Sequence, residues 1–156
     1  MKKNILVIHP RCCIRAIKQI EGLIENHNYN ITLITFVDMF GRNIPEHIKN
    51  KINLINFKFR NRLLKRFVFR RLLKNLSTHY EIVHCHNEPN YYIRDVISVF
   101  KNRVPIVYDI HDFTSMRSGN ENLNESFAYV NSDYVIHVNN DFISYGDEKY
   151  GIKKSS

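Results

Sequence analysis

The chain has 156 residues, of which 44% are apolar, and a formal net charge of +8. This length suits one domain with a single core, and the apolar content excludes an intrinsically disordered chain. No run of about 18 apolar residues is present, which excludes a bilayer-spanning helix. The apolar stretch at residues 5–8 is too short for the core of a signal peptide, so we expect a cytoplasmic protein.

Apolar, β-branched runs alternate with helix-like stretches along the whole chain. The expected strands are 5–9, 31–37, 52–57, 81–86, 105–111 and 133–138. The expected helices are 14–24, 60–76, 89–101, 121–131 and 139–150, the last ended by Gly151. The stretches around Pro45 and Gly119 are expected to be loops. This alternation predicts an α/β fold with a doubly wound, mostly parallel, Rossmann-like sheet.

Four segments resemble motifs of one known family. They are residues 3–8, 80–87, 104–112 and 132–139. Their order and spacing are similar to those of the N-terminal domain of family 4-like GT-B glycosyltransferases, over essentially the whole chain. The resemblance implies half of a GT-B fold, with an acceptor-side domain at residues 1–151 and the start of an interdomain linker at 152–156. We expect the donor-binding C-terminal domain to be absent from this chain.

The resemblance also implies a function. The chain is expected to bind a lipid-linked or envelope glycan that accepts a sugar from a nucleotide-sugar donor, which is a co-substrate, with no cofactor. Transfer would need a donor-binding C-terminal GT-B domain on another chain, so the isolated chain is expected to be inactive. The alternative is a non-catalytic α/β binding or scaffolding module derived from a truncated glycosyltransferase.

Three histidines follow predicted strands at the end where such sheets bind ligands. With the strand order 3-2-1-4-5-6, His9, His86 and His111 would line one rim of a cleft. The resemblance implies that His111 approaches the donor sugar and supports transfer, a role that suits imidazole in either protonation state. The alternative for His111 is a bond to the backbone that caps its strand. His84 shares a strand face with His86 and is expected in the core.

Other polar residues of the motifs are candidates for substrate binding. Asn87 would contact the acceptor or order its loop, and Asp112 would orient the His111 ring or cap the following turn. Arg11 and Arg15 lie at the start of a predicted helix, where exposed amides favour a phosphate. The turn at residues 9–15 lacks the glycines that the family often has there, which argues against a phosphate cradle made of backbone alone.

Metal and redox chemistry are not expected. Zinc needs three or four converging ligands, and the pair His84 and His86 is too common a pattern to indicate a site. Cys12, Cys13 and Cys85 are expected to be free thiols in a reducing compartment. The absence of glycine-rich nucleotide fingerprints argues against a nicotinamide-dependent enzyme or a P-loop NTPase.

The positive charge is concentrated in one predicted helix. Residues 57–78 contain eight basic residues and no acidic residue. The predicted apolar face, expected to pack on the sheet, comprises Leu63, Leu64, Phe67, Val68, Leu72, Leu73 and Leu76. The residues nominated for an anionic membrane surface are Arg62, Lys65, Arg66 and Arg70. A solvated basic surface is the alternative, and nucleic acid is not expected because no recognition motif is present.

Overall fold

A computed structural model describes residues 2–27, 29–36, 44–58, 62–87 and 90–151. The strands are β1 (Asn4–Ile8), β2 (Asn30–Phe36), β3 (Asn53–Phe57), β4 (Ile82–His86), β5 (Ile106–Ile110) and β6 (Tyr134–His137). The helices are α1 (Ile14–His27), α2 (Glu46–Lys49), α3 (Arg62–Leu76), α4 (Ile93–Phe100), α5 (Thr114–Ser118), α6 (Leu123–Asn131) and α7 (Asn140–Tyr150), with a 3₁₀ turn η1 (Asn90–Tyr92) before α4.

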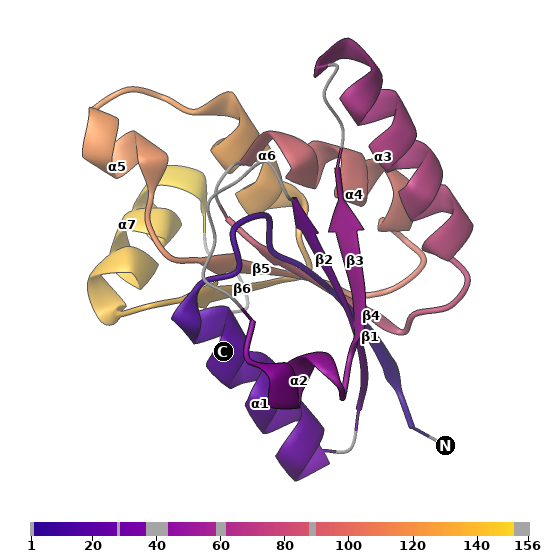
Figure 1. Cartoon of the computed structure of the whole chain (residues 1–156). Helices are drawn as coiled ribbons and strands as arrows, with labels where there is room; N and C mark the ends of the chain where they lie inside the picture. Colours follow the sequence, from indigo (N-terminus) through magenta and orange to yellow (C-terminus); the bar gives the residue numbers. More distant parts are fainter. Residues whose placement is uncertain (1, 28, 37–43, 59–61, 88–89, 152–156) are drawn as a thin grey trace.

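The six strands form one sheet in the order β3-β2-β1-β4-β5-β6, and every neighbouring pair is parallel (Figure 1). The predicted Rossmann-like α/β class and strand order are therefore confirmed. From β1 the strands are added toward one edge of the sheet, and from β4 they are added toward the other edge. The carboxyl ends of β1 and β4 are therefore the topological switch point. The predictions for Val37, for Pro89 and for the linker at 152–156 lie outside the described residues.

Two short helices, α2 and α5, occupy stretches that the sequence predicts as loops. Each is about one turn long, too short to give a periodic pattern. The start of α5 is held from a distance, because the Glu125 carboxylate accepts hydrogen bonds from the amides of Thr114 (2.6 Å) and Ser115 (3.4 Å). Gly119, with a φ of 68°, ends α5 in the left-handed conformation. The first turn of α5 is therefore stabilised by a residue of α6, a contact that no local pattern predicts.

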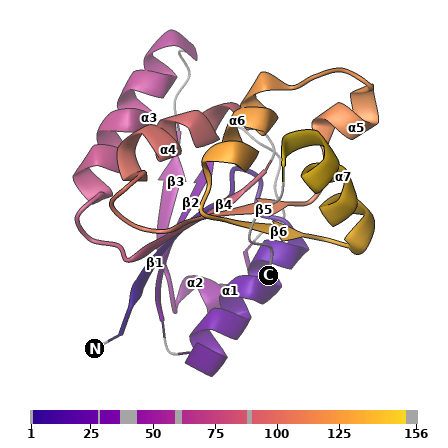
Figure 2. The same cartoon turned by 180° about the vertical axis from the view of Figure 1, so that it is seen from behind.

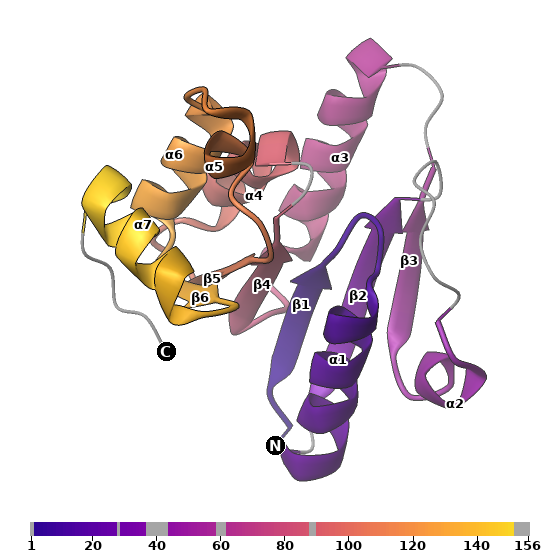
Figure 3. The same cartoon turned by 90° about the vertical axis from the view of Figure 1, so that its left-hand side faces the viewer.

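The helices cover the two faces of the sheet unequally. α1 and α2 lie on one face, over the β1, β2 and β3 side, whereas α3, α4 and α6 lie on the other (Figures 2 and 3). This division follows from right-handed crossovers, because the chain moves outward in opposite directions from β1 and from β4. Next to α1 on this face, a hollow is lined by side chains of the strands and of α1, among them Gln19, Leu23, His84, Val107 and Ile136.

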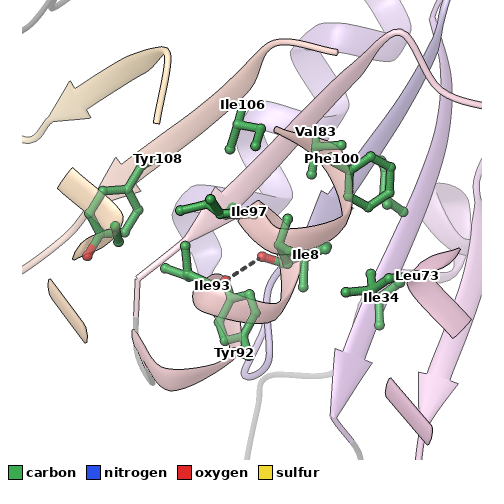
Figure 4. Close-up of a cluster of buried hydrophobic side chains, with 14 of the residues drawn as sticks. Ile8, Ile34, Leu73, Val83, Tyr92, Ile93, Ile97, Phe100, Ile106 and Tyr108 are labelled. Carbon is green, nitrogen blue, oxygen red and sulfur yellow. Dashed lines mark hydrogen bonds between the residues drawn. The ribbon is translucent and has the colours of Figure 1, made fainter. Parts of the chain in front are cut away.

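The α4 face of the sheet holds the larger apolar core. Figure 4 shows Ile8, Val83, Ile106 and Tyr108 of the three neighbouring strands β1, β4 and β5 packed with α4 residues. The Tyr92 hydroxyl donates a hydrogen bond to the Ile8 carbonyl oxygen (3.1 Å), so its polar atom is satisfied inside this core. Because side chains alternate along a strand, the residues next to these apolar side chains point to the α1 face.

Candidate functional site

Three histidines converge at the carboxyl ends of β1, β4 and β5. His86 Nδ1 lies 3.0 Å from His111 Nε2. The rings of His9 and His86 stack with centroids 4.4 Å apart, and the rings of His9 and His111 meet edge-on at 5.7 Å. The predicted meeting of these residues is therefore present, and it follows from parallel strands that end at one edge of the sheet.

The three histidines differ in burial. His111 keeps 22% of its side chain exposed, as expected for the rim, whereas His9 and His86 are buried. His111 is therefore the member of the three that solvent reaches, and His9 and His86 lie behind it. Burial, followed by the positive charges of neighbouring histidines, lowers the pKa of His86 well below its ordinary value. His86 is consequently a neutral imidazole at physiological pH.

A buried carboxylate, Asp109, lies beneath the histidines. Arg15 pairs with Asp109 Oδ1 at 3.1 Å, and Gln19 donates a hydrogen bond to Asp109 Oδ2 at 2.7 Å. His84 Nε2 and His111 Nε2 each lie 3.4 Å from an Asp109 oxygen. Burial acts to raise the pKa of Asp109, but the contacts with His84, Gln19 and Arg15 outweigh it and hold the pKa below its usual value. Asp109 is therefore an ionised counter-charge.

Sequence reasoning did not nominate Asp109, although a signal was present. It stands two positions before His111 in an otherwise apolar strand, so the two residues share a face. Arg15, predicted to bind a substrate phosphate, has its guanidinium on this internal carboxylate and is partly exposed. His84 is buried, as predicted for the core, and its ring contacts the same carboxylate.

Cys13 is a second residue that sequence reasoning missed. Its Sγ lies 3.2 Å from His9 Nε2 and 3.6 Å from His111 Nδ1. Burial acts to raise the pKa of Cys13, but hydrogen bonds from His111 and His9 lower it to about 5. Burial raises the pKa of Cys12 to about 11, and it also raises the pKa of the buried Cys85. All three cysteines are free, as predicted, and Cys13 alone among them is a thiolate at neutral pH.

The turn between β1 and α1 is closed by its own hydrogen bonds. Cys12 adopts a φ of 40°, the left-handed conformation that glycine would favour at such a turn. Its amide bonds to the His9 carbonyl oxygen (3.4 Å), and the Cys13 amide donates to His9 Nε2 (3.2 Å). Since both amides have internal partners, a phosphate at this turn would have to be bound by side chains.

Asn87 and Asp112 organise the loop that follows β5. Asn87 is buried, accepts a hydrogen bond from the His111 amide (2.9 Å) and donates one to the Asp112 carbonyl oxygen. This geometry fits the predicted loop-ordering alternative for Asn87. The Asp112 carboxylate pairs with Arg117 at 2.6 Å. The positioning of the His111 ring therefore involves His86, Cys13 and Asp109, which its own nitrogens contact.

A polar cavity of about 430 Å³ opens at the same edge of the sheet. It is lined by Arg11, Asn90, Tyr91, Thr114, Arg117, Asn122 and Asn124. These residues come from the loops after β1, β4 and β5 and from the start of α6. Of them, only Arg11 was predicted from the sequence. The others stand in or next to η1, α5 and α6, whose proximity depends on the fold, and no local motif marks them.

Among the described residues, two groups of side chains have the composition and spacing to hold a metal ion. One ring nitrogen from each of His9, His86 and His111 lies within 4.8 Å of the others. The second group, His84, His86 and Asp109, has the same spacing but is buried throughout. In the sequence only His84 and His86 are close together, whereas the tertiary fold brings the other members of the two groups beside them.

The basic helix α3 packs differently from the prediction. Phe69 and Leu73 are buried against the sheet, and Val68, Leu72 and Leu76 pack beside them. Leu64 and Phe67 do not face the sheet as expected but are 52% and 67% exposed. At 100° per residue they lie on the side of the helix opposite Phe69 and Leu73, because the buried stripe runs through 69, 73 and 76.

The basic residues nominated for a membrane surface are partly engaged inside the protein. Arg66 makes two hydrogen bonds to the buried Asp95 (2.9 and 3.1 Å), and Arg70 lies 3.8 Å from the same carboxylate. The Lys65 ammonium lies 5.0 Å from the Phe36 ring centre. The side chain of Arg62 lies outside the described residues. The exposed stripe of α3 instead comprises Leu64, Phe67, Arg71 and Lys74, and we call it the outer α3 stripe.

None of the helices formed by the described residues has the length and apolarity needed to span a bilayer. No protein-family model matches this chain, and no curated protein matches it at a significant level.

Proposed function

We propose that this chain is the acceptor-binding half of a family 4-like GT-B glycosyltransferase, and that a donor-binding domain on another chain completes the enzyme. The observation that carries the proposal is the position of the polar cavity and the three histidines. Both lie at the carboxyl edge of the sheet, the edge at which open α/β sheets bind ligands.

The chemistry of the cavity supports a carbohydrate ligand. Its volume is in the range of small-molecule sites, and its lining offers guanidinium, amide and hydroxyl groups. Such groups match the many hydroxyls of a sugar, or the phosphate of a lipid-linked sugar, better than an apolar ligand. The four segments that resemble the family contribute β1, β4, β5 and β6, which are neighbours in the sheet.

His111 is the residue of the cluster that would face substrate. It is partly exposed, whereas His9 and His86 are buried behind it. Its Nε2 lies 3.4 Å from the Asp109 carboxylate and its Nδ1 lies 3.6 Å from Cys13 Sγ, so both ring nitrogens have polar neighbours that fix the orientation of the ring. In this proposal His111 acts on the donor, and the buried histidines fix its position.

The turn after β1 favours the alternative, a module that binds carbohydrate without transferring it. The amides of Cys12 and Cys13 already have internal partners, so the backbone offers less to a donor phosphate than a glycine-rich turn would. Both functions use the polar cavity, and they differ in whether a partner domain yields turnover.

Carbohydrate binding by the chain alone tests what the two functions share. The chain, labelled with ¹⁵N, is titrated with sugar phosphates, oligosaccharides and short-chain lipid-linked sugars while amide shifts are followed. We expect shifts around Arg11, Thr114 and Asn124, and at least about tenfold weaker binding for Arg11→Ala, since a charge-assisted bond contributes about 1.5–3 kcal/mol. Lys18→Ala, an exposed change in α1 away from the cavity lining, is the matched control.

Shifts scattered over the surface, or equal weakening by both variants, would rule out the cavity as the carbohydrate site. Turnover separates the two functions. We expect no transfer from a nucleotide sugar by the chain alone, and transfer once a donor-binding GT-B domain is added. Turnover by the chain alone would contradict the division into two halves.

We further propose that the outer α3 stripe rests on an anionic membrane surface. Leu64 and Phe67 are exposed apolar side chains, and Arg71 and Lys74 continue the same stripe toward the end of the helix. Apolar insertion and attraction to anionic headgroups would therefore act together, with about 1 kcal/mol from each basic residue near the surface.

Vesicle sedimentation with and without phosphatidylserine tests this surface. We expect binding that needs anionic lipid, weakens with salt, and falls at least about tenfold in the Leu64→Ser, Phe67→Ser double variant. Leu123→Ser, which alters an apolar side chain that is 69% exposed on α6, is the control. Replacing Arg66 is avoided because its loss would leave the buried Asp95 carboxylate without its ion pair. Equal binding of the double variant and the parent would refute the proposal.

A further inference from the structure

His9 carries a buried ring nitrogen with no hydrogen-bond partner. Its Nε2 is engaged by the Cys13 amide and lies 3.2 Å from Cys13 Sγ, whereas its Nδ1 is buried and unpaired. A buried polar atom without a partner costs about 1–3 kcal/mol, so such atoms are rare in folded proteins. The Cys13 amide donates to Nε2, so Nδ1 is the nitrogen through which this ring could bind an ion, with release of its proton.

The neighbouring histidines present nitrogens at a similar spacing. His86 Nδ1 and His111 Nε2 lie 3.0 Å apart, and the three rings each place a nitrogen within 4.8 Å of the others. Two donors bound to one tetrahedral zinc ion at about 2.0–2.3 Å lie roughly 3.3–3.8 Å apart. The His86–His111 separation is slightly shorter than this range and the His9 nitrogen lies within 4.8 Å of both, so the rings would have to turn to bind one ion.

We propose that His9, His86 and His111 form a binding site for a divalent transition metal, with zinc as the best fit. Three imidazoles are a ligand set that zinc accepts, and three protein ligands leave one position for water or an oxygen of an anionic ligand. His111 is the exposed member, so this open position faces the solvent side of the cluster.

The surroundings suit a cation. The Asp109 carboxylate lies 3.4 Å from His111 Nε2 and 3.8 Å from His86 Nδ1. This carboxylate lies beside the two nitrogens of the 3.0 Å pair, so it places a negative charge next to the position of the ion. Cys13 contacts both His9 and His111, which adds a sulfur atom beside the ligands. The second group, His84, His86 and Asp109, shares His86 but has its carboxylate engaged by Arg15 and Gln19.

The inference is independent of the proposed function, because metal binding can be measured on the chain alone without a sugar. The tag-free, metal-free chain is titrated with Zn²⁺ by calorimetry and with Co²⁺ by visible absorption. We expect one ion per chain, the intense absorption of four-coordinate Co²⁺, and a rise in Tm with Zn²⁺ through mass action. A chain that binds zinc but no carbohydrate would keep this inference and lose the function proposed above.

Two kinds of variant locate the site. His111→Asn should weaken Zn²⁺ binding at least about 100-fold, the upper effect known even for groups that only support a ligand. His47→Asn, which removes an exposed histidine outside the cluster, should leave the affinity unchanged. His84→Asn should change the affinity less than about tenfold, because His84 belongs only to the second group.

Failure to retain one ion, or equal loss in His47→Asn, would overturn the proposal. Loss in His84→Asn with none in His111→Asn would assign the ion to the second group and would also overturn it. Because variants of the buried His9 and His86 risk misfolding, these two are tested in the unaltered chain by the ring ¹⁵N shifts of its histidines. Zinc should shift His9, His86 and His111, and absence of a shift in any of the three would contradict the ligand set.

Discussion

The two faces of the same three strands have opposite character. On the α4 face, Ile8, Cys85 and Tyr108 belong to a closed apolar core. On the α1 face, His9, His86 and Asp109 stand one residue further along each strand and form a polar cluster. Adjacent residues of each strand thus belong either to the core that stabilises the fold or to the polar cluster. The alternation of a strand makes this possible without any change in backbone.

The charged and polar side chains of the α1 face are buried together with their partners. Asp109 has Arg15, Gln19 and His84 around it, so its charge is compensated inside the protein. Isolated charges in such a place would cost far more than the apolar contacts they replace. Stability on one face should therefore depend on packing volume, and on the other face on the pairing of polar groups.

The largest effect is expected on the apolar face. Phe100→Ala removes a fully buried ring of α4 that packs against the sheet and should cost about 3–5 kcal/mol of unfolding free energy. Urea denaturation measures this loss. Under the proposed function, carbohydrate binding by the folded fraction should be unchanged. A cost below about 1 kcal/mol would contradict the assignment of this face as the stabilising core.

A smaller loss is expected when the polar face loses its charge. Asp109→Asn keeps the volume but leaves Arg15 without its buried partner, at a cost of about 1–3 kcal/mol. Glu148→Gln, an exposed change in α7, should have an effect within about 0.5 kcal/mol and serves as the control. Equal stabilities of the two variants in urea would mean that the ion pair contributes nothing.

One polar side chain on the apolar face, His137, can be replaced to gain stability. Both ring nitrogens of His137 are buried without a partner, beside the rings of Phe113 and Tyr129. His137→Phe should stabilise the fold by about 1 kcal/mol, since it removes unsatisfied polar atoms and keeps an aromatic ring. Thermal and urea unfolding at pH 7.5 (roughly one unit above the usual pKa of histidine) measure the change. A loss of stability would show that the ring nitrogens are satisfied in solution.

The stability gained in His137→Phe should also depend on pH. Burial lowers the pKa of His137 below its ordinary 6.5, although the charges of Asp147 and Asp109 oppose this. The unfolded chain therefore binds a proton that the folded chain resists, and the parent loses stability as the pH falls through about 6.5. The difference in stability between His137→Phe and the parent should grow between pH 7.5 and pH 5. A difference that does not vary with pH would contradict the lowered pKa.

The smallest effect on stability, with the largest on activity, is expected at His111. In the metal-free chain His111→Asn should change the unfolding free energy by about 1 kcal/mol or less, because the side chain is partly exposed and asparagine keeps a polar group beside His86 and Asp109. In a complex with a donor-binding domain it should lower transfer by about 10² or more. Undiminished transfer would remove His111 from the reaction and leave the polar face as a binding surface.

Much of the fold could be predicted because its signals are local. The continuously apolar segments mark buried parallel strands, and helical periodicity marks α1, α3 and α4 between them. The failures are also physical. α5 depends on the Glu125 carboxylate, which contacts it from α6, and the buried stripe of α3 includes Phe69 where the sequence offered several equally apolar faces.

The candidate site divides in the same way. The sequence by itself determined which residues follow the strands, so His9, His86 and His111 could be placed at one edge once a parallel sheet was assumed. Only the tertiary structure decided what surrounds them. Cys13 between two imidazoles, Asp109 beneath them and the loop residues of the cavity are brought together by crossovers and strand register, which act between segments distant in the chain. Contacts between residues far apart in the chain leave no local sequence pattern, because the neighbours of each residue are set by the fold.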